Sequence, residues 1–123
     1  MENQAYWDLL INRSVSRFFL LAALAQEPMH GYQIGKTVEE ATGACCSPSA
    51  AMIYPALHEL MERGYVVCDV ERTGARERKV CALTPKGRQV YQTAARAWQR
   101  ILPFLQQATE AAFSPEKKEA PVS

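Results

Sequence analysis

The stretches Met29-His30-Gly31-Tyr32 and Ile53-Tyr54-Pro55-Ala56-Leu57 decide the fold that we expect for this chain. The first opens an amphipathic helix, predicted from residue 31 to about residue 42, with a turn that uses the flexible backbone of Gly31. The second lies in another amphipathic helix, predicted from residue 49, where serine is a good N-cap, to residue 62 or 63. Two short helices therefore form the centre of the predicted fold.

A predicted β-hairpin follows the second of these helices. Residues 65–72 and 77–83 are rich in valine and long enough to form strands, and Thr73-Gly74-Ala75-Arg76 provides the turn between them. Helix, turn, helix, turn and hairpin, in that order, is the arrangement of a winged helix-turn-helix. We therefore predict a mostly α fold with a small β-hairpin, in which the hairpin is the wing.

Two further helices flank this unit. The first is predicted over residues 14–26, capped by Ser14 or Ser16 and ended by Glu27-Pro28, because a residue before proline is pushed out of helical geometry. The last begins at Thr84-Pro85, a capping threonine followed by proline at the first helical position. The predicted organisation is a lead at 1–13, a winged-helix domain at 14–84, a C-terminal dimerisation helix at 85–113 and a disordered tail at 114–123.

The last helix carries an apolar stripe that a chain of this size has little core left to cover. Its members alternate at three and four residues, which is an a/d-type seam. The stripe predicts a homodimer in which this helix packs against its mate or against the mate's first helix. Pro103 falls within the stripe, so we expect a bend near residues 99–103. The stripe consists of Tyr91, Ala94, Trp98, Ile101, Leu105, Ala108 and Ala112.

Composition limits the class of protein. With 123 residues, 48% of them apolar, the chain is long enough for one domain with a real core. Its 14 basic and 13 acidic residues give a net charge of only +1, so the distribution of charge must carry any argument about nucleic acid. The longest apolar run, residues 18–25, is too short to span a bilayer, and the polar start is unlike a secretory leader. We therefore expect a cytoplasmic protein that does not bind membranes.

Polar and cationic side chains gather where a winged helix meets DNA. The helix at 49–62 would enter the major groove, where its outward polar side chains contact phosphates or base edges and Met52 meets a thymine methyl. Between Glu71 and Lys79 the hairpin carries four cations against two acids, a local excess of +2. The alternative is a solvated hairpin with ordinary surface charges. The predicted DNA-binding residues are Lys36, Ser49, Met52, Tyr54, His58, Arg72, Arg76, Arg78 and Lys79.

Four motifs in order resemble the PadR family of bacterial transcriptional regulators. The similarity covers roughly residues 15–105 and is closest to the branch with a single C-terminal dimerisation helix. It implies a dimeric repressor that is released from double-stranded DNA by a small aromatic or other planar effector. Two positions depart from the family pattern, which often has glycine at Ala51 and aromatic residues at Val80 and Cys81. The motifs are Pro28-Met29-His30-Gly31-Tyr32, Ile53-Tyr54-Pro55-Ala56-Leu57-His58, Glu62-Arg63-Gly64, and Arg78-Lys79 with Leu83-Thr84 and Gly87-Arg88.

An effector site is predicted in the middle of the dimer seam. Trp98 and its symmetry mate could stack a planar ligand between the protomers, as in some members of the family. Trp7, Phe18 and Phe19 are the expected neighbours. The alternative is that Trp98 only packs in the core or the interface, which is the more common role of a tryptophan at helical spacing.

Four cysteines leave a second kind of input open. Cys45-Cys46 lies just before the helix predicted to read DNA, where a thiolate near a helix N-terminus is favoured electrostatically. With Gly74-Ala75 as a two-residue turn, Cys68 and Cys81 stand directly opposite each other as a non-hydrogen-bonded pair. That pair could form a disulfide or contribute to a metal site, although the chain has no CxxC motif. The more common alternative is four reduced, small apolar side chains.

Three functions follow from these patterns. The first is a sequence-specific transcriptional regulator, a dimeric repressor released by a small effector. The second is a thiol-redox or metal-responsive regulator on the same scaffold. The third is a winged helix that binds protein rather than DNA, which the basic hairpin disfavours. An enzyme is not expected, and no cofactor, because the sequence shows no nucleophile-base-acid set, phosphate loop or metal triad.

Overall fold

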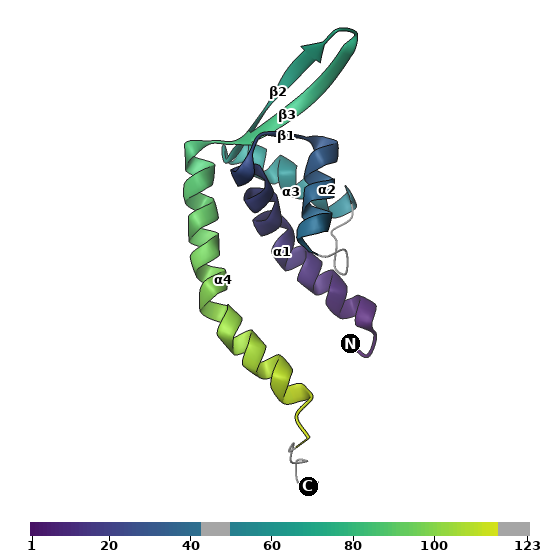
Figure 1. Cartoon of the computed structure of the whole chain (residues 1–123), viewed down its shortest axis with the longest axis vertical. Coiled ribbons are helices and arrows are strands. Elements are labelled where there is room, and N and C mark those ends of the chain that lie inside the picture. Colours follow the sequence, from purple (N-terminus) through teal and green to yellow (C-terminus); the bar gives the residue numbers. More distant parts are fainter. Residues whose placement is uncertain (43–49, 116–123) are drawn as a thin grey trace.

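The computed structural model describes residues 1–42 and 50–115, which form four helices and a three-stranded antiparallel sheet. The helix α1 packs against each of the other three helices, and the hairpin projects beyond the helical body (Figure 1). The prediction of a mostly α fold with a small β-hairpin is confirmed. The elements are α1 (Gln4–Gln26), β1 (Met29–His30), α2 (Gly31–Ala41), α3 (Ala50–Glu62), β2 (Val66–Thr73), β3 (Arg76–Leu83) and α4 (Pro85–Ala112).

The first helix begins ten residues earlier than we predicted. It starts at Gln4, because Asn3 caps it by accepting a hydrogen bond from the backbone N–H of Ala5 at 2.8 Å. The prediction that Ser14 or Ser16 caps the helix is wrong. Both lie inside α1, where their hydroxyls donate to backbone carbonyls of the preceding turn, those of Ile11 and Asn12. Residues 4–13 of the expected lead are therefore part of one long helix.

The core lies between α1, α2 and α3. Leu20 and Leu24 of α1 and Ile34 and Val38 of α2 are at most 1% exposed. The predicted inner face of α3 packs on them, with its aliphatic side chains buried and Met61 partly buried. The buried residues of α3 are Ile53, Ala56, Leu57 and Leu60.

The sheet contains a strand that sequence patterns did not predict. The short strand β1 pairs with β3, which makes β3 the central strand in the order β1-β3-β2. The register of the hairpin is as predicted, since β2 and β3 are joined by the two-residue turn Gly74-Ala75 and Cys68 lies opposite Cys81. Gly74 has a φ of 65°, the left-handed geometry that glycine adopts without strain.

Glycine at position 31 does not have the backbone role that we predicted. It is the first residue of α2, and positive φ angles occur among the described glycines at Gly64 and Gly74. A Cβ at this position would lie 3.8 Å from the hydroxyl of Tyr54, an ordinary contact. The helix α2 ends at Ala41, close to the predicted end near residue 42.

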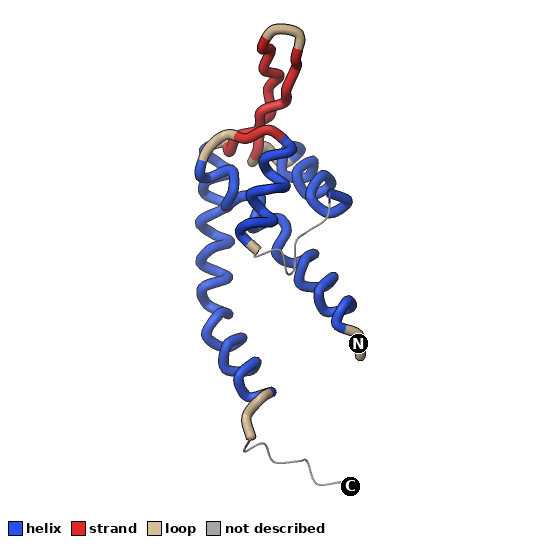
Figure 2. The backbone as a smooth tube through the Cα atoms, turned by 45° about the vertical axis from the view of Figure 1, so that its right-hand side comes forward, coloured by secondary structure: helices blue, strands red, loops and turns tan. Residues whose placement is uncertain are grey.

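The N-terminal half of the long helix α4 packs against the rest of the chain, whereas its C-terminal half is exposed. Thr84 caps it as predicted, accepting from the backbone N–H of Gly87 at 3.0 Å, and Pro85 is its first residue. From residue 101 to residue 115 the helix and the residues after it are exposed. Its C-terminal half turns away from the axis of the first half, and Pro103 lies within this part (Figure 2).

Most of the predicted tail, residues 116–123, lies outside the described residues. Within the described part of the chain, none of the helices is both long and apolar enough to cross a bilayer.

We expect Gly87→Ala to destabilise the fold by about 2–3 kcal/mol, because the added methyl overpacks a rigid site. A Cβ at Gly87 would lie 2.0 Å from the carbonyl oxygen of Tyr65, which accepts the backbone N–H of Thr84. Urea denaturation measures the loss. The matched control is Gly35→Ala in α2, whose Cβ would lie 4.0 Å from Ile53. It should keep or raise stability, and equal stability of the two variants would contradict the packing argument.

Candidate nucleic-acid interface

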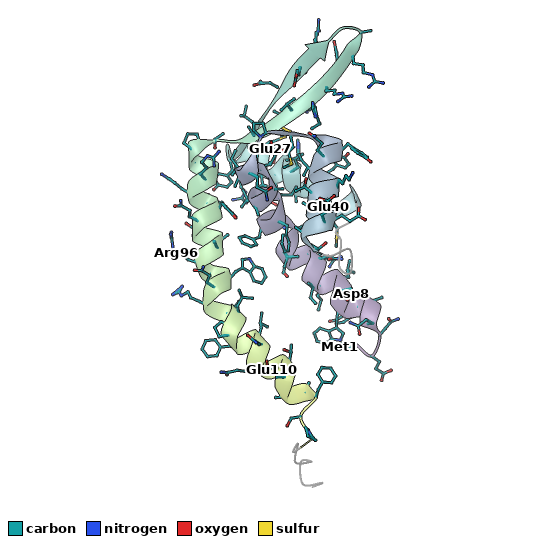
Figure 3. The ribbon with its side chains drawn as sticks, in the orientation of Figure 1. Met1, Asp8, Glu27, Glu40, Arg96 and Glu110 are labelled. Carbon is teal, nitrogen blue, oxygen red and sulfur yellow. A yellow bond between two sulfur atoms is a disulfide. The ribbon has the colours of Figure 1, made fainter. Side chains whose placement is uncertain are left out.

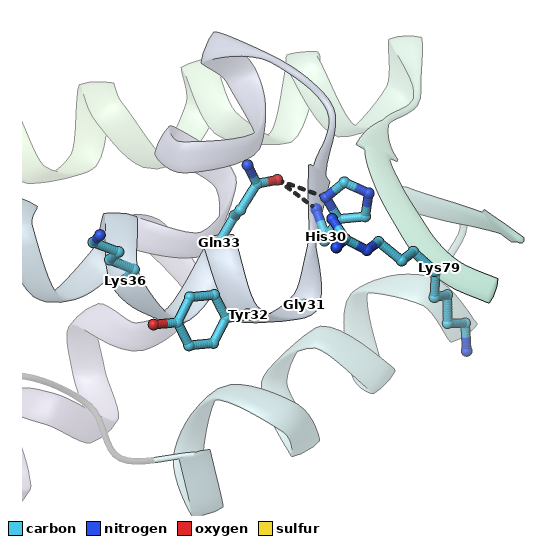
Figure 4. Close-up of a pocket in the computed structure, with 7 residues that line it drawn as sticks. His30, Gly31, Tyr32, Gln33, Lys36 and Lys79 are labelled. Atoms are coloured by element: carbon cyan, nitrogen blue, oxygen red, sulfur yellow. Dashed lines mark hydrogen bonds between the residues drawn. The ribbon is translucent and has the colours of Figure 1, made fainter. Parts of the chain in front are cut away.

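A hollow lies where the base of the hairpin meets the start of α2. Its volume is about 660 Å³, and the described residues that line it include three cations and no carboxylate. Figure 4 shows Lys36 on α2 and Lys79 on β3 at opposite ends of the residues that line it. Lys36, Arg78 and Lys79 form no ion pair within the described part of the chain. We call Lys36, Arg78 and Lys79 the cationic cluster.

The start of α2 is held in place by one glutamine. Gln33 Oε1 accepts from the backbone N–H of His30 at 3.1 Å and from its ring Nδ1 at 2.8 Å (Figure 4). His30 Nε2 lies 3.8 Å from Glu71 of β2. These contacts fix the first turn of α2 against the hairpin, beside the cationic cluster. Tyr32 is 81% exposed at the same place.

The side chains of α3 that were predicted to contact DNA differ in exposure. Tyr54 is 56% exposed, whereas Met52 is half-buried. His58 is exposed and lies 3.0 Å from Glu62 one turn later. Glu59 of α3 accepts from Nε of Arg17 of α1 at 2.6 Å and lies 3.5 Å from Arg63. The prediction for Ser49 lies outside the described residues.

The outer part of the hairpin carries the remaining predicted cations. Arg72 of β2 lies 3.0 Å from Glu77 of β3, and both side chains are largely exposed. Arg76 follows the turn and is exposed. Arg72 is therefore partly neutralised by its neighbour, whereas Arg78 and Lys79 lie closer to α2. The structure thus brings Lys36, Arg78 and Lys79 together and leaves Arg72 and Arg76 nearer the tip.

The aromatic residues predicted for an effector fall into two groups. The ring centroids of Phe18 and Trp98 are 6.0 Å apart, and Phe18 also contacts Phe19 at 5.9 Å and Tyr91 at 5.7 Å. Trp98 borders a hollow of about 370 Å³ between α1, α3 and α4. Trp7 is not part of this group, because it packs edge-on against Tyr6 and donates to the carbonyl of Met1 at 2.8 Å.

The cysteines of the hairpin are bonded to each other. Cys68 and Cys81 form a disulfide with Cα atoms 4.0 Å apart. The more common alternative of reduced side chains is therefore wrong for this pair, and the structure has the disulfide rather than a metal site. Cys45 and Cys46 lie outside the described residues. In residues 1–42 and 50–115, no group of three or more His, Cys, Asp or Glu side chains is placed to hold a metal ion.

Sequence reasoning missed two residues of this interface. Tyr32 and Gln33 line the hollow with Lys36, yet we had treated the start of α2 only as a structural motif. A signal was available, because residues four apart share one face of a helix and Tyr32 therefore lies beside Lys36. The contact between Arg17 and Glu59 had no signal of this kind in the neighbouring sequence.

Comparison with known proteins identifies relatives of this chain. The model of the family described as "Transcriptional regulator PadR-like family" matches residues 20–93, which include α2, α3 and the hairpin. The Transcriptional regulator YqjI of Escherichia coli is 34% identical over 73 residues, 59% of this chain and 34% of that protein. An uncharacterised 37.1 kDa protein in transposon Tn4556 of Streptomyces fradiae is 35% identical over 86 residues, 70% of this chain and 24% of that protein. The chain thus spans about a third or less of the length of these relatives.

Solved structures share the fold at lower identity. A transcriptional regulator from Clostridium thermocellum superposes with a TM-score of 0.71 at 20% identity, covering 79% of this chain and 95% of the other. A PadR family transcriptional regulator from Eggerthella lenta gives a TM-score of 0.68 at 22% identity, covering 88% of this chain and 98% of the other. The fold described above is therefore that of known transcriptional regulators.

Proposed function

Because this chain belongs to the PadR-like family of transcriptional regulators, we propose that it is a cytoplasmic homodimeric repressor that binds operator DNA and is released by a small planar effector. The observation that carries the DNA-binding part is the cationic cluster. Three cations line one hollow without an ion pair among the described residues, next to α3 and to the base of a projecting hairpin. Unpaired cations in this position suit phosphate contacts on both sides of a helix that lies in the major groove.

Exposed apolar side chains support the homodimer. In α1, Trp7, Leu10 and Ile11 are 41–47% exposed, and in α4, Ile101 and Leu105 are each 45% exposed. Figure 1 shows that these halves of α1 and α4 lie apart from each other. Each half therefore has an apolar face that its own chain leaves in solvent. A second copy that packs on these faces would bury them, and the resulting dimer would carry two copies of the cationic cluster.

A mobility shift tests the DNA-binding proposal. The purified protein is mixed with the DNA upstream of its own gene, with competitor DNA, at near-physiological salt. A shift that specific competitor removes and unrelated competitor does not remove is expected. If no specific shift occurs even at low salt, the DNA proposal fails and a winged helix that binds protein becomes the better account. A reporter gene behind the bound DNA then distinguishes repression from activation.

The group around Phe18 and Trp98 is the proposed effector site. Its rings lie 6.0 Å apart beside a hollow, on the part of α4 that leads into the exposed stripe. We expect Trp98→Ala to weaken binding of planar aromatic compounds at least about tenfold, because a lost ring removes both stacking and apolar area. Equilibrium dialysis of the compounds against each protein measures the loss.

The matched control for this variant is Tyr32→Ala. It removes an aromatic side chain that is 81% exposed on α2, outside the group and outside the faces proposed for the dimer. The control should bind the compounds as the unmodified protein does. If the two variants bind equally well, Trp98 only packs, and the effector must be sought elsewhere.

Thiol–disulfide exchange is a second candidate input. The observation that favours it is the disulfide between Cys68 and Cys81 across the base of the hairpin. Reduction would release the two strands from their covalent link near α3. The same mobility shift, run with the disulfide intact and after reduction by a dithiol, separates this input from a planar effector.

A further inference from the structure

Three sulfur-bearing side chains meet where the base of the hairpin packs on α3. Cys68 of β2 is joined to Cys81 of β3, and Met61 of α3 places its Sδ 3.6 Å from Cys68 Sγ. Cys81 is 2% exposed, and the other two side chains are half-buried. The sulfur atoms therefore lie together in largely apolar surroundings.

A hollow opens onto these sulfur atoms. It has a volume of about 280 Å³ and is lined by Met61, Cys68 and Cys81 together with Tyr54 and His58. Tyr54 is 56% exposed and His58 is exposed, so the hollow borders the outer face of α3. A small ion can thus reach the sulfur atoms from solvent.

We propose that, once the disulfide is reduced, this site binds one soft monovalent metal ion, with Cu(I) as the representative, through Cys68, Cys81 and Met61. Thiolate and thioether sulfurs are the ligands that select Cu(I). With metal–sulfur bonds of about 2.3 Å, three sulfurs in a trigonal plane lie about 4 Å apart. The 3.6 Å between Met61 and Cys68 is close to this spacing before any rearrangement.

Reduction and metal binding balance as two separate steps. A dithiol transfers two electrons and two protons to the Cys68–Cys81 disulfide, which becomes two thiols, while the dithiol becomes a cyclic disulfide. Each thiol then loses its proton to solvent as its sulfur binds the ion. The bound ion would join β2, β3 and α3 at one point, whereas the disulfide joins only β2 and β3.

The surroundings decide which kind of ion fits. Zn(II) in proteins usually takes four nitrogen, sulfur or oxygen ligands. The described residues offer no group of three or more His, Cys, Asp or Glu side chains placed around a common point. Among the described residues, the third ligand beside Cys68 and Cys81 is therefore the thioether of Met61. A thioether ligand favours soft ions over zinc.

The test is a Cu(I) titration against a chromophoric Cu(I) chelator without oxygen. It uses the full chain carrying Cys45→Ser and Cys46→Ser, because Cys68 and Cys81 are then its remaining cysteines. After reduction and removal of the dithiol, one equivalent of Cu(I) should bind, and Zn(II) should not displace it. With the disulfide intact, no tight binding is expected. Cys68→Ser with Cys81→Ser should abolish binding, and retention of one equivalent there would overturn the proposal.

Two methionine variants test the third ligand. Met61→Leu should weaken Cu(I) binding at least about tenfold, the smallest loss typical of altered metal shells. Met29→Leu is the matched control, since Met29 lies opposite Cys81 in the sheet and is 5% exposed, but does not line the hollow. It should leave the affinity unchanged. Equal losses in both variants, or none in Met61→Leu, would overturn the three-sulfur site. The titration contains no DNA, so its outcome is independent of the proposed repressor function.

Discussion

Replacing Arg78 and Lys79 together by alanine should weaken specific DNA binding about 100- to 1,000-fold at near-physiological salt. The two side chains belong to the cationic cluster and form no ion pair within the described chain. A dimer would lose four phosphate contacts, and each contact contributes about 0.9 to the slope of log affinity against log salt. The slope should therefore become shallower by about 3–4. Fluorescence anisotropy at several salt concentrations measures both quantities.

The control must remove the same charge from elsewhere. Arg96→Ala with Arg100→Ala does so on α4, where Figure 3 shows Arg96 on the side away from the other helices and far from the hairpin. Arg100 follows four residues later on the same face. This variant should keep the salt slope of the unmodified protein. If both double variants reduce affinity equally, net charge rather than the cationic cluster determines binding, and the assigned interface is wrong.

Glutamate at both Ile101 and Leu105 should convert the protein to a monomer and abolish specific DNA binding. These side chains are each 45% exposed on the half of α4 that its own chain leaves uncovered. Burial of unpaired carboxylates costs several kcal/mol, so the dissociation constant of the dimer should rise at least about 100-fold. Because an isologous contact contains each change twice, the loss is doubled. Sedimentation equilibrium measures the dissociation constant.

A matched variant places the same charges on the opposite side of α4. Gln99→Glu with Gln107→Glu lies on the face away from Ile101 and Leu105, as the helical repeat requires. It should remain a dimer with unchanged DNA binding. Circular dichroism and thermal unfolding check that each chain is folded. An Ile101→Glu, Leu105→Glu variant that stays dimeric would show that this stripe is not the dimer contact.

Local signals made most of the fold predictable. The periodic apolar residues of α2 and α3, the Thr84-Pro85 start of α4 and the Gly74-Ala75 turn all lie within a few residues of what they determine. The turn also fixed the register of the hairpin, and with it the position of Cys68 opposite Cys81. A two-residue turn leaves one antiparallel register, so counting outward from it is sufficient.

The errors concern contacts between distant parts of the chain. The strand β1 has only two residues and exists because it pairs with β3, about fifty residues later. The contact between Glu59 of α3 and Arg17 of α1, 42 residues away, likewise had no signal in the local sequence. The start of α1 was missed for a different reason. Two serines offered competing caps inside a helix whose true cap, Asn3, precedes a weakly amphipathic segment.

The interface was predictable in its residue types but not in its grouping. Sequence reasoning did not distinguish among the four hairpin cations as DNA-binding residues, which are Arg72, Arg76, Arg78 and Lys79. The structure pairs Arg72 with Glu77 and brings Arg78 and Lys79 to Lys36, because β3 is the central strand and lies beside the start of α2. The grouping depends on β1, the element without a sequence signal.

The most direct test of the central claim is sedimentation velocity with a fluorescent DNA duplex from the region upstream of the protein's own gene. The protein is titrated against this duplex and against a shuffled duplex of equal length and composition, at near-physiological salt. We predict that two chains bind each specific duplex and that the shuffled duplex stays free at the same protein concentration. Equal binding of both duplexes, or a complex that saturates with one chain per duplex, would contradict a sequence-specific homodimer.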